Sequence, residues 1–532
     1  MKLRNILALS LLSVAGMVQA QQQVAVFSVN DFHGAFVANK DKGIVGAPAV
    51  WQTLDSLKRV YPVNVTVSAG DNFGGSYFYN ATHGVLMPVF FNDLGIRLSA
   101  LGNHEFDDGQ RSLAEKWGHS PLRPADWDIT YVCANVRQTA TGAVPSFAQP
   151  VASVPLTLPD GRTFRVAFVG LIASSTPQQA SVRRLGGLSF DGRYPAVIDS
   201  VMQLPEASLV KDANLRLLLT HNGTVMDSDN QPQWDDKDAS QLQQISVPWL
   251  HGILSSHSHK PVCGYINQAH YPIVQGRWHG DYISMLLCTI DNRTLEVTKV
   301  EPHLVRVTPK TQLEAGPARL QAQIDSLLQH TTTPGGTPIG TPLTTAAKDM
   351  PHDRDNKYRQ SDVGTLVCKA YAEAFRHAAG KSDKTPIIGC SHFGSIRAGF
   401  GKGKVTVLDV GEALPFSNAL KVYELTGKQL MALVQFGLHN QRYGWLQTGN
   451  LLITQDANTN VTALSYVSAQ GKRTPIKPQS KCYLVADEFI TNGGDGYSTD
   501  FFPVKQEVKV AHLPATTDAF INYLRQQPSI GQ

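Results

Sequence analysis

Five short segments of the chain place metal-binding or proton-handling side chains directly after apolar, strand-like runs. The segments are 30–34 (Asn-Asp-Phe-His-Gly), 70–72 (Gly-Asp-Asn), 102–107 (Gly-Asn-His-Glu-Phe-Asp), 221–223 (His-Asn-Gly) and 257–259 (His-Ser-His). In an open α/β sheet, ligands gather beyond the carboxyl ends of the strands. We therefore expect the five segments to converge on one site, although they lie far apart along the chain.

Seven of these side chains are suited to hold two divalent cations. They are Asp31, His33, Asp71, Asn103, His221, His257 and His259. Asp31 and His33 lie two positions apart and are expected on the same side of an extended segment, and Asp71 is best placed to bridge two cations. Oxygen and nitrogen ligands without a thiolate favour Mn, Zn, Co or Fe. Two such cations roughly 3.5–4 Å apart can clamp a phosphoryl oxygen and lower the pKa of a shared water.

His104 is predicted to act on the substrate and not to hold a cation. If the neighbouring Asn103 points at a metal, His104 points elsewhere and can face the substrate. Asp107, on a turn or first helical turn, is close enough to accept a hydrogen bond from the imidazole and fix its tautomer. A carboxylate partner raises the pKa of an imidazole, and the cation would stabilise charge on a phosphoryl group. We assign His104 and Asp107 as the catalytic dyad.

The length of the chain and its pattern of apolar and polar residues predict two domains. A chain of 532 residues exceeds a single core, which stops growing at roughly 250–300 residues. Residues 21–310 alternate strand-like runs with polar helical stretches, which is typical of a layered α/β domain. Segment 311–345 contains Leu320, Ile324 and Leu327 at helical spacing, followed by a Thr/Pro/Gly-rich stretch, and is predicted to be a linker helix and loop. A second domain is expected over 346–532.

Charge and hydropathy argue against two classes of partner. The formal net charge is +4 and the hydrophobic fraction 42%, a balance that favours neither a nucleic-acid polymer nor an acidic membrane. Beyond the N-terminus no apolar run approaches the roughly 20 residues of a membrane span. The sequence does not indicate an oligomeric state.

The first twenty residues predict an export signal. Lys2 and Arg4 form a basic start, residues 6–14 an apolar stretch, and residues 18–20 (Val-Gln-Ala) a small-residue cleavage site. We therefore expect a periplasmic or secreted protein.

Six cysteines in so long a chain do not make a disulfide scaffold. Cys133 and Cys288 are predicted to be buried and Cys263 to lie in a loop, and whether Cys263 is bridged stays open.

The five segments, in this order, resemble the calcineurin-like metallophosphoesterase domain of bacterial periplasmic 5′-nucleotidases and UDP-sugar hydrolases. The likeness extends almost to the C-terminus. It implies an N-terminal four-layer α/β/β/α sandwich, a connecting helix and a C-terminal α+β nucleotide-binding domain. It also implies one metal held by Asp31, His33 and His259 and another by Asn103, His221 and His257, with Asp71 bridging. The chain departs from the family at 255–256, where two serines replace a usual glycine pair.

The same resemblance places substrate recognition in the second domain. Segments 394–397 (Gly-Ser-Ile-Arg), 414–418 (Leu-Pro-Phe-Ser-Asn) and 489–496 (Phe-Ile-Thr-Asn-Gly-Gly-Asp-Gly) are similar to the family's nucleotide-binding domain. The similarity implies that Phe416 and Phe489 sandwich a base, that Asp495 accepts hydrogen bonds from ribose hydroxyls, and that Arg354 and Arg397 meet negative charge.

One further pocket residue follows from a departure from the family. His392 stands where relatives commonly carry an asparagine that contacts the base, so it is assigned to the same pocket. Either Lys357 or Arg359 is expected to be a second basic residue that contacts the substrate.

The reaction that these residues predict is hydrolysis of a phosphoester by a metal-activated water, with His104 supporting the developing charge. The expected substrates are nucleoside 5′-monophosphates, with nucleotide sugars or dinucleotides as further candidates. One alternative is a 2′,3′-cyclic-nucleotide phosphodiesterase with 3′-nucleotidase action, and another is a nucleotide-binding protein without catalysis. Because catalytic and base-binding residues lie on different domains, the likeness implies a domain movement during turnover.

Overall fold

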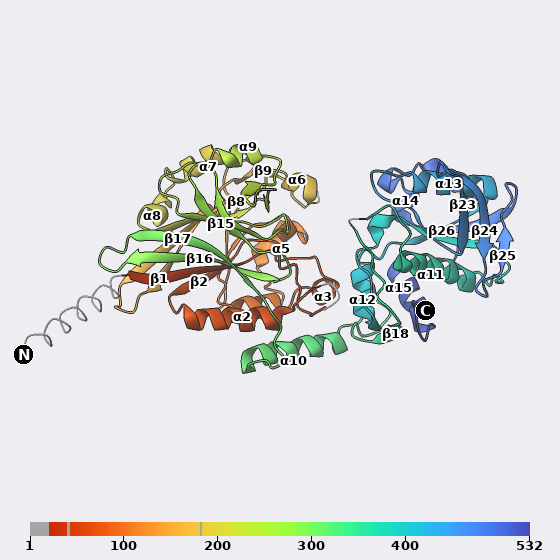
Figure 1. Cartoon of the computed structure of the whole chain (residues 1–532), viewed down its shortest axis with the longest axis horizontal. Coiled ribbons are helices and arrows are strands. Elements are labelled where there is room, and N and C mark those ends of the chain that lie inside the picture. The colour runs from red at the N-terminus through yellow and green to blue at the C-terminus, as the bar shows by residue number, and fades with distance from the viewer. Residues whose placement is uncertain (1–20, 40–42, 181–183, 355) are drawn as a thin grey trace, which may run out of the picture. The chain divides into compact units, whose positions relative to one another are not determined.

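The computed structural model describes residues 21–39, 43–180, 184–354 and 356–532, so the predicted export signal at 1–20 lies outside the described residues. The chain divides into two compact units after Ser326. Each unit has its own sheets and its own core (Figure 1).

Two stacked sheets form the centre of the N-terminal unit. The seven-stranded sheet has the order β17 (Val297–Arg306), β16 (Tyr282–Asp291), β1 (Gln21–Val29), β2 (Asn64–Ser68), β3 (Leu98–Ala100), β4 (Thr130–Val132) and β6 (Ala148–Gln149). The six-stranded sheet has the order β14 (Val262–Ile266), β15 (Tyr271–Gln275), β13 (Gly252–Leu254), β10 (Leu215–His221), β8 (Thr163–Ile172) and β7 (Val151–Thr157). Strands β1 to β4 are mutually parallel, as are β8, β10, β13 and β15.

The two sheets bury a common core of branched and aromatic side chains. Val26 of β1 and Val67 of β2 belong to the same buried cluster as Phe168 of β8 and Leu217 of β10. Strands buried on both faces read as nearly continuous apolar runs, which explains the sequence of β1 from its fourth residue onward. At Gly170 of β8, a Cβ atom would meet the carbonyl oxygen of Val132 in β4 at 2.3 Å, so only glycine permits this close approach of the sheets.

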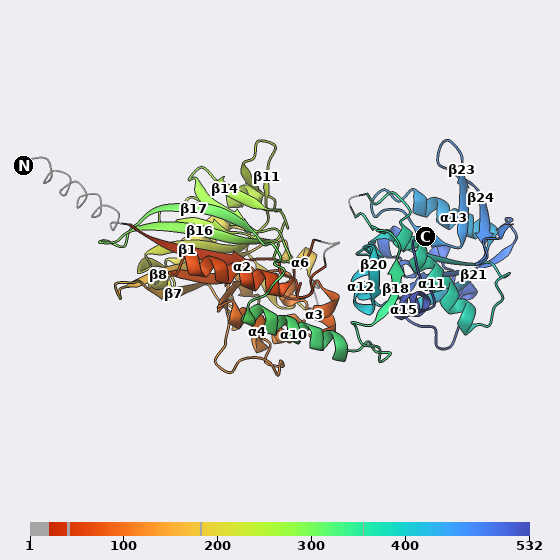
Figure 2. The ribbon, with the colours of Figure 1, turned by 60° about the horizontal axis from the view of Figure 1, so that its bottom comes forward.

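Helices cover the outer faces of both sheets. α7 (Tyr194–Val201), α8 (Ala207–Lys211) and α9 (Ala239–Gln243) lie on the six-stranded sheet, and α2 (Ala47–Val60) lies across the seven-stranded sheet (Figures 1 and 2). α2 begins with Pro48 in its first turn and carries Lys58 and Arg59 in its last turn, both favourable positions in a helix. The predicted four-layer α/β/β/α sandwich is thereby confirmed.

Shorter elements connect these layers. They are α3 (Tyr77–Thr82), α4 (Met87–Asp93), the 3₁₀ turn η2 (His104–Phe106), α5 (Gly109–Glu115), α6 (Thr176–Gln179) and the two-stranded pairs β5 (Val136–Gln138) with β9 (Leu188–Phe190) and β11 (Thr224–Met226) with β12 (Pro232–Trp234). The helix α10 (Ala315–His330) follows β17, and Leu320 and Ile324 are its fully buried apolar residues. The division between the two units falls within α10.

The C-terminal unit has an α+β fold around a four-stranded sheet. The order of that sheet is β21 (Leu420–Thr426), β26 (Lys481–Asp487), β19 (Ile387–Ser391) and β22 (Gln447–Gly449). α11 (Asp362–Ala378) packs on β19 and β22, and α13 (Gly427–Leu438) packs on the other side of β26 (Figure 1). Ser361 caps α11, and capping boxes at Thr406 and Thr426 start α12 (Val407–Ala413) and α13.

The remaining elements of this unit surround the central sheet. They are β18 (Pro342–Ala346) with β20 (Gly403–Thr406), the antiparallel sheet β23 (Leu451–Gln455), β24 (Val461–Val467) and β25 (Arg473–Pro475), α14 (Glu488–Thr491), α15 (Thr516–Arg525) and the 3₁₀ turns η3 (Phe393–Ser395), η4 (Gly494–Gly496), η5 (Thr499–Phe501) and η6 (Val504–Gln506). Within the described ranges, no helix combines the length and the apolar character that crossing a membrane requires.

The cysteines are unpaired, and one of them lies outside its predicted environment. All six fall within described ranges and are free thiols. Cys133 and Cys288 are fully buried, as predicted. Cys263 was expected in a loop but lies in β14, because residues 262–266 pair with β15, with Cys263 opposite Val274.

Candidate active site

The five predicted segments meet at one edge of the N-terminal unit. Each begins at the last residue of a parallel strand or within three residues beyond it, after β1, β2 and β3 of one sheet and β10 and β13 of the other. Because the two sheets are stacked with these carboxyl ends on the same side, side chains from both sheets converge there.

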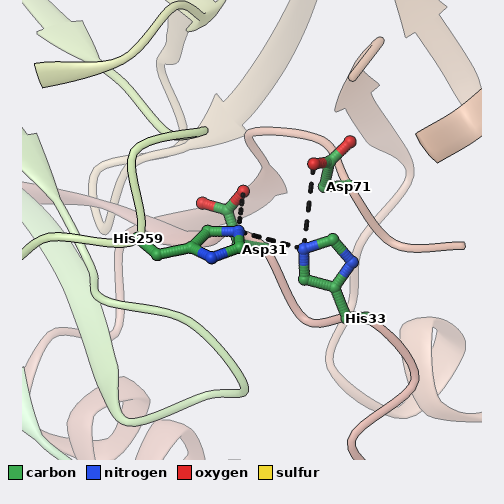
Figure 3. A group of neighbouring side chains, drawn as sticks. All are labelled: Asp31, His33, Asp71 and His259. Carbon is green, nitrogen blue, oxygen red and sulfur yellow. Dashed lines mark hydrogen bonds and ion pairs between the residues drawn. The ribbon is translucent and has the colours of Figure 1, made fainter. Parts of the chain in front are cut away.

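The first cluster joins the segments after β1, β2 and β13. It comprises Asp31, His33, Asp71 and His259, whose ligand atoms all lie within 4.8 Å of one another (Figure 3). The Nε2 atoms of His33 and His259 are 3.1 Å apart. The Oδ1 atom of Asp31 lies 3.6 Å from His259 Nε2, and the Oδ2 atom of Asp71 lies 3.8 Å from His33 Nε2.

The second cluster shares Asp71 with the first. It comprises Asp71, His221 and His257. His221 Nε2 lies 3.1 Å from Asp71 Oδ2 and 3.9 Å from Asp31 Oδ1. The aspartate between the clusters is therefore in the position of a bridge.

These residues fit a pair of cations by their donor atoms. Asp31, Asp71 and His221 have exposed fractions of 1% or less, so their charges are removed from water. The buried polar atoms without a hydrogen-bond partner in the described part of the chain include Asn103 Oδ1 and His221 Nε2. Buried polar groups are rarely left unpaired, and a cation is a partner for both atoms. The convergence of two imidazole nitrogens at 3.1 Å also favours a cation between them.

The protonation states of His33, His257 and Asp71 suit metal binding. Burial lowers the pKa of His33 and of His257 to about 4, so both imidazoles carry free lone pairs at neutral pH. Burial acts to raise the pKa of Asp71, but His221 and other histidines outweigh it and hold that pKa well below its usual range. Burial also disfavours the His221 cation, yet Asp71 and Asp31 raise the pKa of His221 to about 10. The two carboxylates thus stabilise positive charge at this position.

The backbone of the site differs from the expectation of an extended segment at Asp31 and His33. Both residues have φ of 49°, in the left-handed region, because β1 ends at Val29 and the chain turns immediately. Asp71, His257 and His259 also have positive φ. Such conformations are uncommon for residues with a Cβ atom and gather at functional sites. A turn, and not the alternation of a strand, brings Asp31 and His33 to the same cluster.

The two residues predicted as a catalytic dyad lie close together beside these clusters. His104 Nδ1 lies 2.7 Å from Asp107 Oδ2 across the turn η2, and both side chains are about one-third exposed. The rings of His104 and His33 are 4.9 Å apart at their centroids. Burial acts to lower the pKa of His104, but the hydrogen bond that its ring donates to Asp107 and the charge of Asp71 raise it to about 9. His104 is therefore a cation at neutral pH.

Sequence reasoning gave no role to Glu105, which the structure places at the centre of the loop packing. It is fully buried. Its carboxylate accepts hydrogen bonds from the backbone N–H groups of Asp71 (2.8 Å), Asn72 (2.7 Å) and Gly102 (2.6 Å), and from Asn72 Nδ2 (3.0 Å). The signal was the acidic residue inside the Gly-Asn-His-Glu segment. Glu105 ties the segment that carries Asp71 to the segment that carries Asn103.

A second group missed from the sequence supports His259. The indole of Trp278 stacks on His259 with centroids 4.9 Å apart and on His279 with centroids 3.9 Å apart. The backbone N–H of His279 donates to the carbonyl of Asp31 at 2.8 Å. The stacking of Trp278 on His259 therefore helps to fix the orientation of the His259 ring. No sequence pattern marked this pair, since aromatic residues after a strand are common.

The predicted pocket residues of the C-terminal unit form two stacked pairs. The rings of Phe489 and His392 stack with centroids 4.7 Å apart, and His392 Nδ1 lies 2.7 Å from Asp495 Oδ2. Asp495, predicted to meet ribose hydroxyls, thus also holds His392. Asp495 has a φ of 50° and lies in a loop between neighbouring glycines.

The second pair joins Arg397 to Phe416, with the guanidinium 4.9 Å from the ring centroid. Burial and the charge of Arg354 lower the pKa of Arg397, which places both guanidinium groups in one neighbourhood. Phe416 and Phe489 are 53% and 43% exposed, unusually open for phenylalanine. Among the described residues, no ring contact joins Phe416 directly to Phe489.

The comparisons with known proteins cover both units. Residues 338–501 match the family model of the 5′-nucleotidase C-terminal domain. A cell wall protein of Listeria monocytogenes is 25% identical over 571 residues, covering 96% of this chain and 68% of that protein. An apyrase of Anopheles gambiae is 21% identical over 542 residues, covering 96% and 89%.

Solved structures share the fold along the whole chain. The 5′-nucleotidase precursor of Thermus thermophilus superposes with a TM-score of 0.62 at 22% identity, covering 96% of this chain and 97% of that one. The matched C-terminal domain, the two-unit fold and the site of buried aspartates and histidines agree with one another. The C-terminal unit therefore carries a 5′-nucleotidase C-terminal domain, and the chain as a whole has the fold of a 5′-nucleotidase precursor and is similar in sequence to an apyrase.

Proposed function

We propose that the protein is a two-metal hydrolase that releases phosphate from nucleoside 5′-monophosphates. The observation that carries the proposal is that Asp71 belongs to two ligand clusters at once, with the His104–Asp107 pair beside them. The proposed ligands are Asp31, His33 and His259 for one cation, Asn103, His221 and His257 for the other, and Asp71 for both. Manganese, zinc, cobalt and iron(II) suit this set of nitrogen and oxygen donors.

The cations would supply Lewis-acid stabilisation of the phosphoryl group and a water nucleophile at neutral pH. The chain's own contribution centres on His104. Its Nδ1–H is held by Asp107, so the cationic ring can donate from Nε2 to an oxygen that gains charge as the phosphoester bond breaks. Replacing one such donor typically costs roughly 10²–10³-fold in kcat.

We assign the chemistry to the domain at 21–310 and the choice of substrate to the domain at 346–532. Phe416 and Phe489 present exposed rings suited to stacking on a base. Arg354 and Arg397 form a locally positive region suited to a nucleotide's charge. The match of residues 338–501 to a 5′-nucleotidase domain supports this division.

An assay of purified protein tests the function directly. AMP, ADP, UDP-glucose, NAD and a 2′,3′-cyclic nucleotide would each be incubated with Mn²⁺ and with Zn²⁺, and phosphate and nucleoside release measured. The proposal expects the highest kcat/KM with AMP. Preference for the cyclic nucleotide would refute it in favour of a phosphodiesterase. Inactivity on every substrate despite bound metal would indicate a nucleotide-binding protein.

We further propose that the protein acts outside the cytoplasm, as a periplasmic or secreted enzyme. The signal pattern at 1–20 supports this, as does the similarity to a cell wall protein. N-terminal sequencing of exported material should begin at Gln21, and an intact Met1 would contradict the proposal.

A further inference from the structure

Ser256 lies between the strand β13 and the predicted ligand His257, and its side chain points back toward another ligand. It is fully buried. Its Oγ atom lies 2.7 Å from His221 Nδ1, 2.6 Å from the carbonyl oxygen of Ala69 and 3.1 Å from the carbonyl oxygen of Thr220. Ser256 therefore connects the segments that follow three strands, β2, β10 and β13.

The hydrogen-bond chemistry of this group allows one arrangement. A hydroxyl has one hydrogen, and both carbonyl oxygens can only accept, so Ser256 donates to a carbonyl, of which Ala69 is the nearer. His221 Nδ1 lies 2.9 Å from the same carbonyl of Ala69. If Nδ1 carried a lone pair, it would face that carbonyl's lone pairs at this distance. Nδ1 therefore carries a hydrogen, which Ala69 O and Ser256 Oγ share.

The other ring nitrogen is then directed at the proposed cation. With Nδ1–H held on one side, His221 Nε2 lies 3.1 Å from Asp71 Oδ2 and has no hydrogen-bond partner in the described chain. Groups that hold the outer nitrogen of a ligating histidine fix its tautomer and its ring orientation, and their removal typically weakens metal binding by roughly 10–100-fold.

We infer that Ser256 is a positioning residue for His221, and that it supports binding of the cation shared by Asp71, His221 and His257 but not of the cation at Asp31, His33 and His259. The inference rests on the proposed two-cation site. It needs no contact between Ser256 and the substrate.

Metal titration of the full chain tests the inference, with Ser255→Ala as the matched control. Ser255 is equally buried, but its hydroxyl bonds Thr224 Oγ1 at 2.9 Å and not a predicted ligand. Metal-free wild type, Ser256→Ala and Ser255→Ala would be titrated with Zn²⁺ against a competing chelator. Ser256→Ala should bind one of two ions about 10-fold more weakly and the other unchanged. Ser255→Ala should match the wild type for both.

Two results would refute the role of Ser256 and leave the proposed two-cation site standing. One is that Ser256→Ala binds each of the two ions with wild-type affinity. The other is that Ser256→Ala and Ser255→Ala each weaken the binding of the two ions to the same extent. Failure of the wild type to bind metal would refute the proposed function and this inference together. A second measurement covers the case in which Ser256→Ala does not fold. In Zn²⁺-loaded wild type labelled with ¹⁵N-histidine, His221 should carry its hydrogen on Nδ1, and a hydrogen on Nε2 would refute the inference.

Discussion

Replacing Glu105 with glutamine should destabilise the N-terminal unit strongly, although the two side chains have nearly the same shape. Each carboxylate oxygen of Glu105 accepts two hydrogen bonds. One accepts from the N–H groups of Asp71 and Gly102, and the other from the backbone and side-chain N–H groups of Asn72. Glutamine keeps one oxygen but turns the other into an NH₂ group, which would face two donors.

The size of the effect follows from those bonds. Burial and the charge of Asp71 raise the pKa of Glu105 to about 7, so the carboxylate is fully ionised only well above that pH. Under those conditions the variant loses two hydrogen bonds to a charged acceptor, each worth roughly 1.5–3 kcal/mol, so the free energy of unfolding should fall by about 3–6 kcal/mol. Glycine at 102 leaves no room for relief, because a Cβ atom there would already lie 2.2 Å from Asp71 Oδ1. The backbone that carries Asp71 should loosen, and metal affinity should fall with it.

Urea unfolding followed by tryptophan fluorescence measures this change, because six of the seven tryptophans lie in the N-terminal unit. The control is Glu115→Gln, which breaks an exposed i,i+4 ion pair with Arg111 and should cost less than about 0.5 kcal/mol. A cost below about 1 kcal/mol for Glu105→Gln would show that the carboxylate is not needed, and the account of the loop packing would be wrong.

Three further predictions use other parts of the chain. His104→Ala should lower kcat by about 10²–10³-fold with an unchanged metal content by mass spectrometry, and loss of metal would identify His104 as a ligand instead. Phe489→Ala should raise KM for AMP, since stacking is worth roughly 1–3 kcal/mol per base, and an unchanged KM would refute a stacking role. Burial lowers the pKa of His352 from 6.5 to about 4, so the stability that its neutral form contributes is complete above pH 6.5 and is lost as the pH falls toward 4. In His352→Gln, the decrease in the free energy of unfolding of the C-terminal unit on acidification should be smaller by at most about 3 kcal/mol, as measured by calorimetry. An unaltered pH dependence of stability would show that His352 is not the group responsible.

The order of elements and the convergence of the site could be predicted because both follow from local patterns. Continuous apolar runs identify strands that are buried on both faces, and ligands gather at the carboxyl ends of parallel strands. Those two rules place Asp31, Asp71 and His221 at one edge of the fold from sequence alone, and in the structure His221 Nε2 lies 3.1 Å from Asp71 Oδ2 and 3.9 Å from Asp31 Oδ1. The family resemblance, and not periodicity, supplied the division of the ligands into two sets.

The groups that hold the ligands could not be predicted, because their roles depend on contacts between distant segments. Cys263 looked like a loop residue because pairing with β15 leaves no mark on its own neighbours in sequence. The roles of Glu105 and Ser256 depend on which backbone groups the other loops present to them. A carboxylate next to His104 and two positions from Asn103 and Asp107 could equally have been a further metal ligand.

The positive φ values explain why such support is needed. Asp31, His33, Asp71, His257 and His259 all lie in the left-handed region, where a residue with a Cβ atom is typically less stable by roughly 1–2 kcal/mol. No single residue could keep five such turns in place, so the surrounding hydrogen bonds must. His257 N–H donates to both oxygens of Asp31, and Asn30 holds the same carboxylate at 2.6 Å. The ligand positions are therefore set by contacts among the five segments, and a substitution that spares every ligand but breaks one of these contacts should still weaken metal binding.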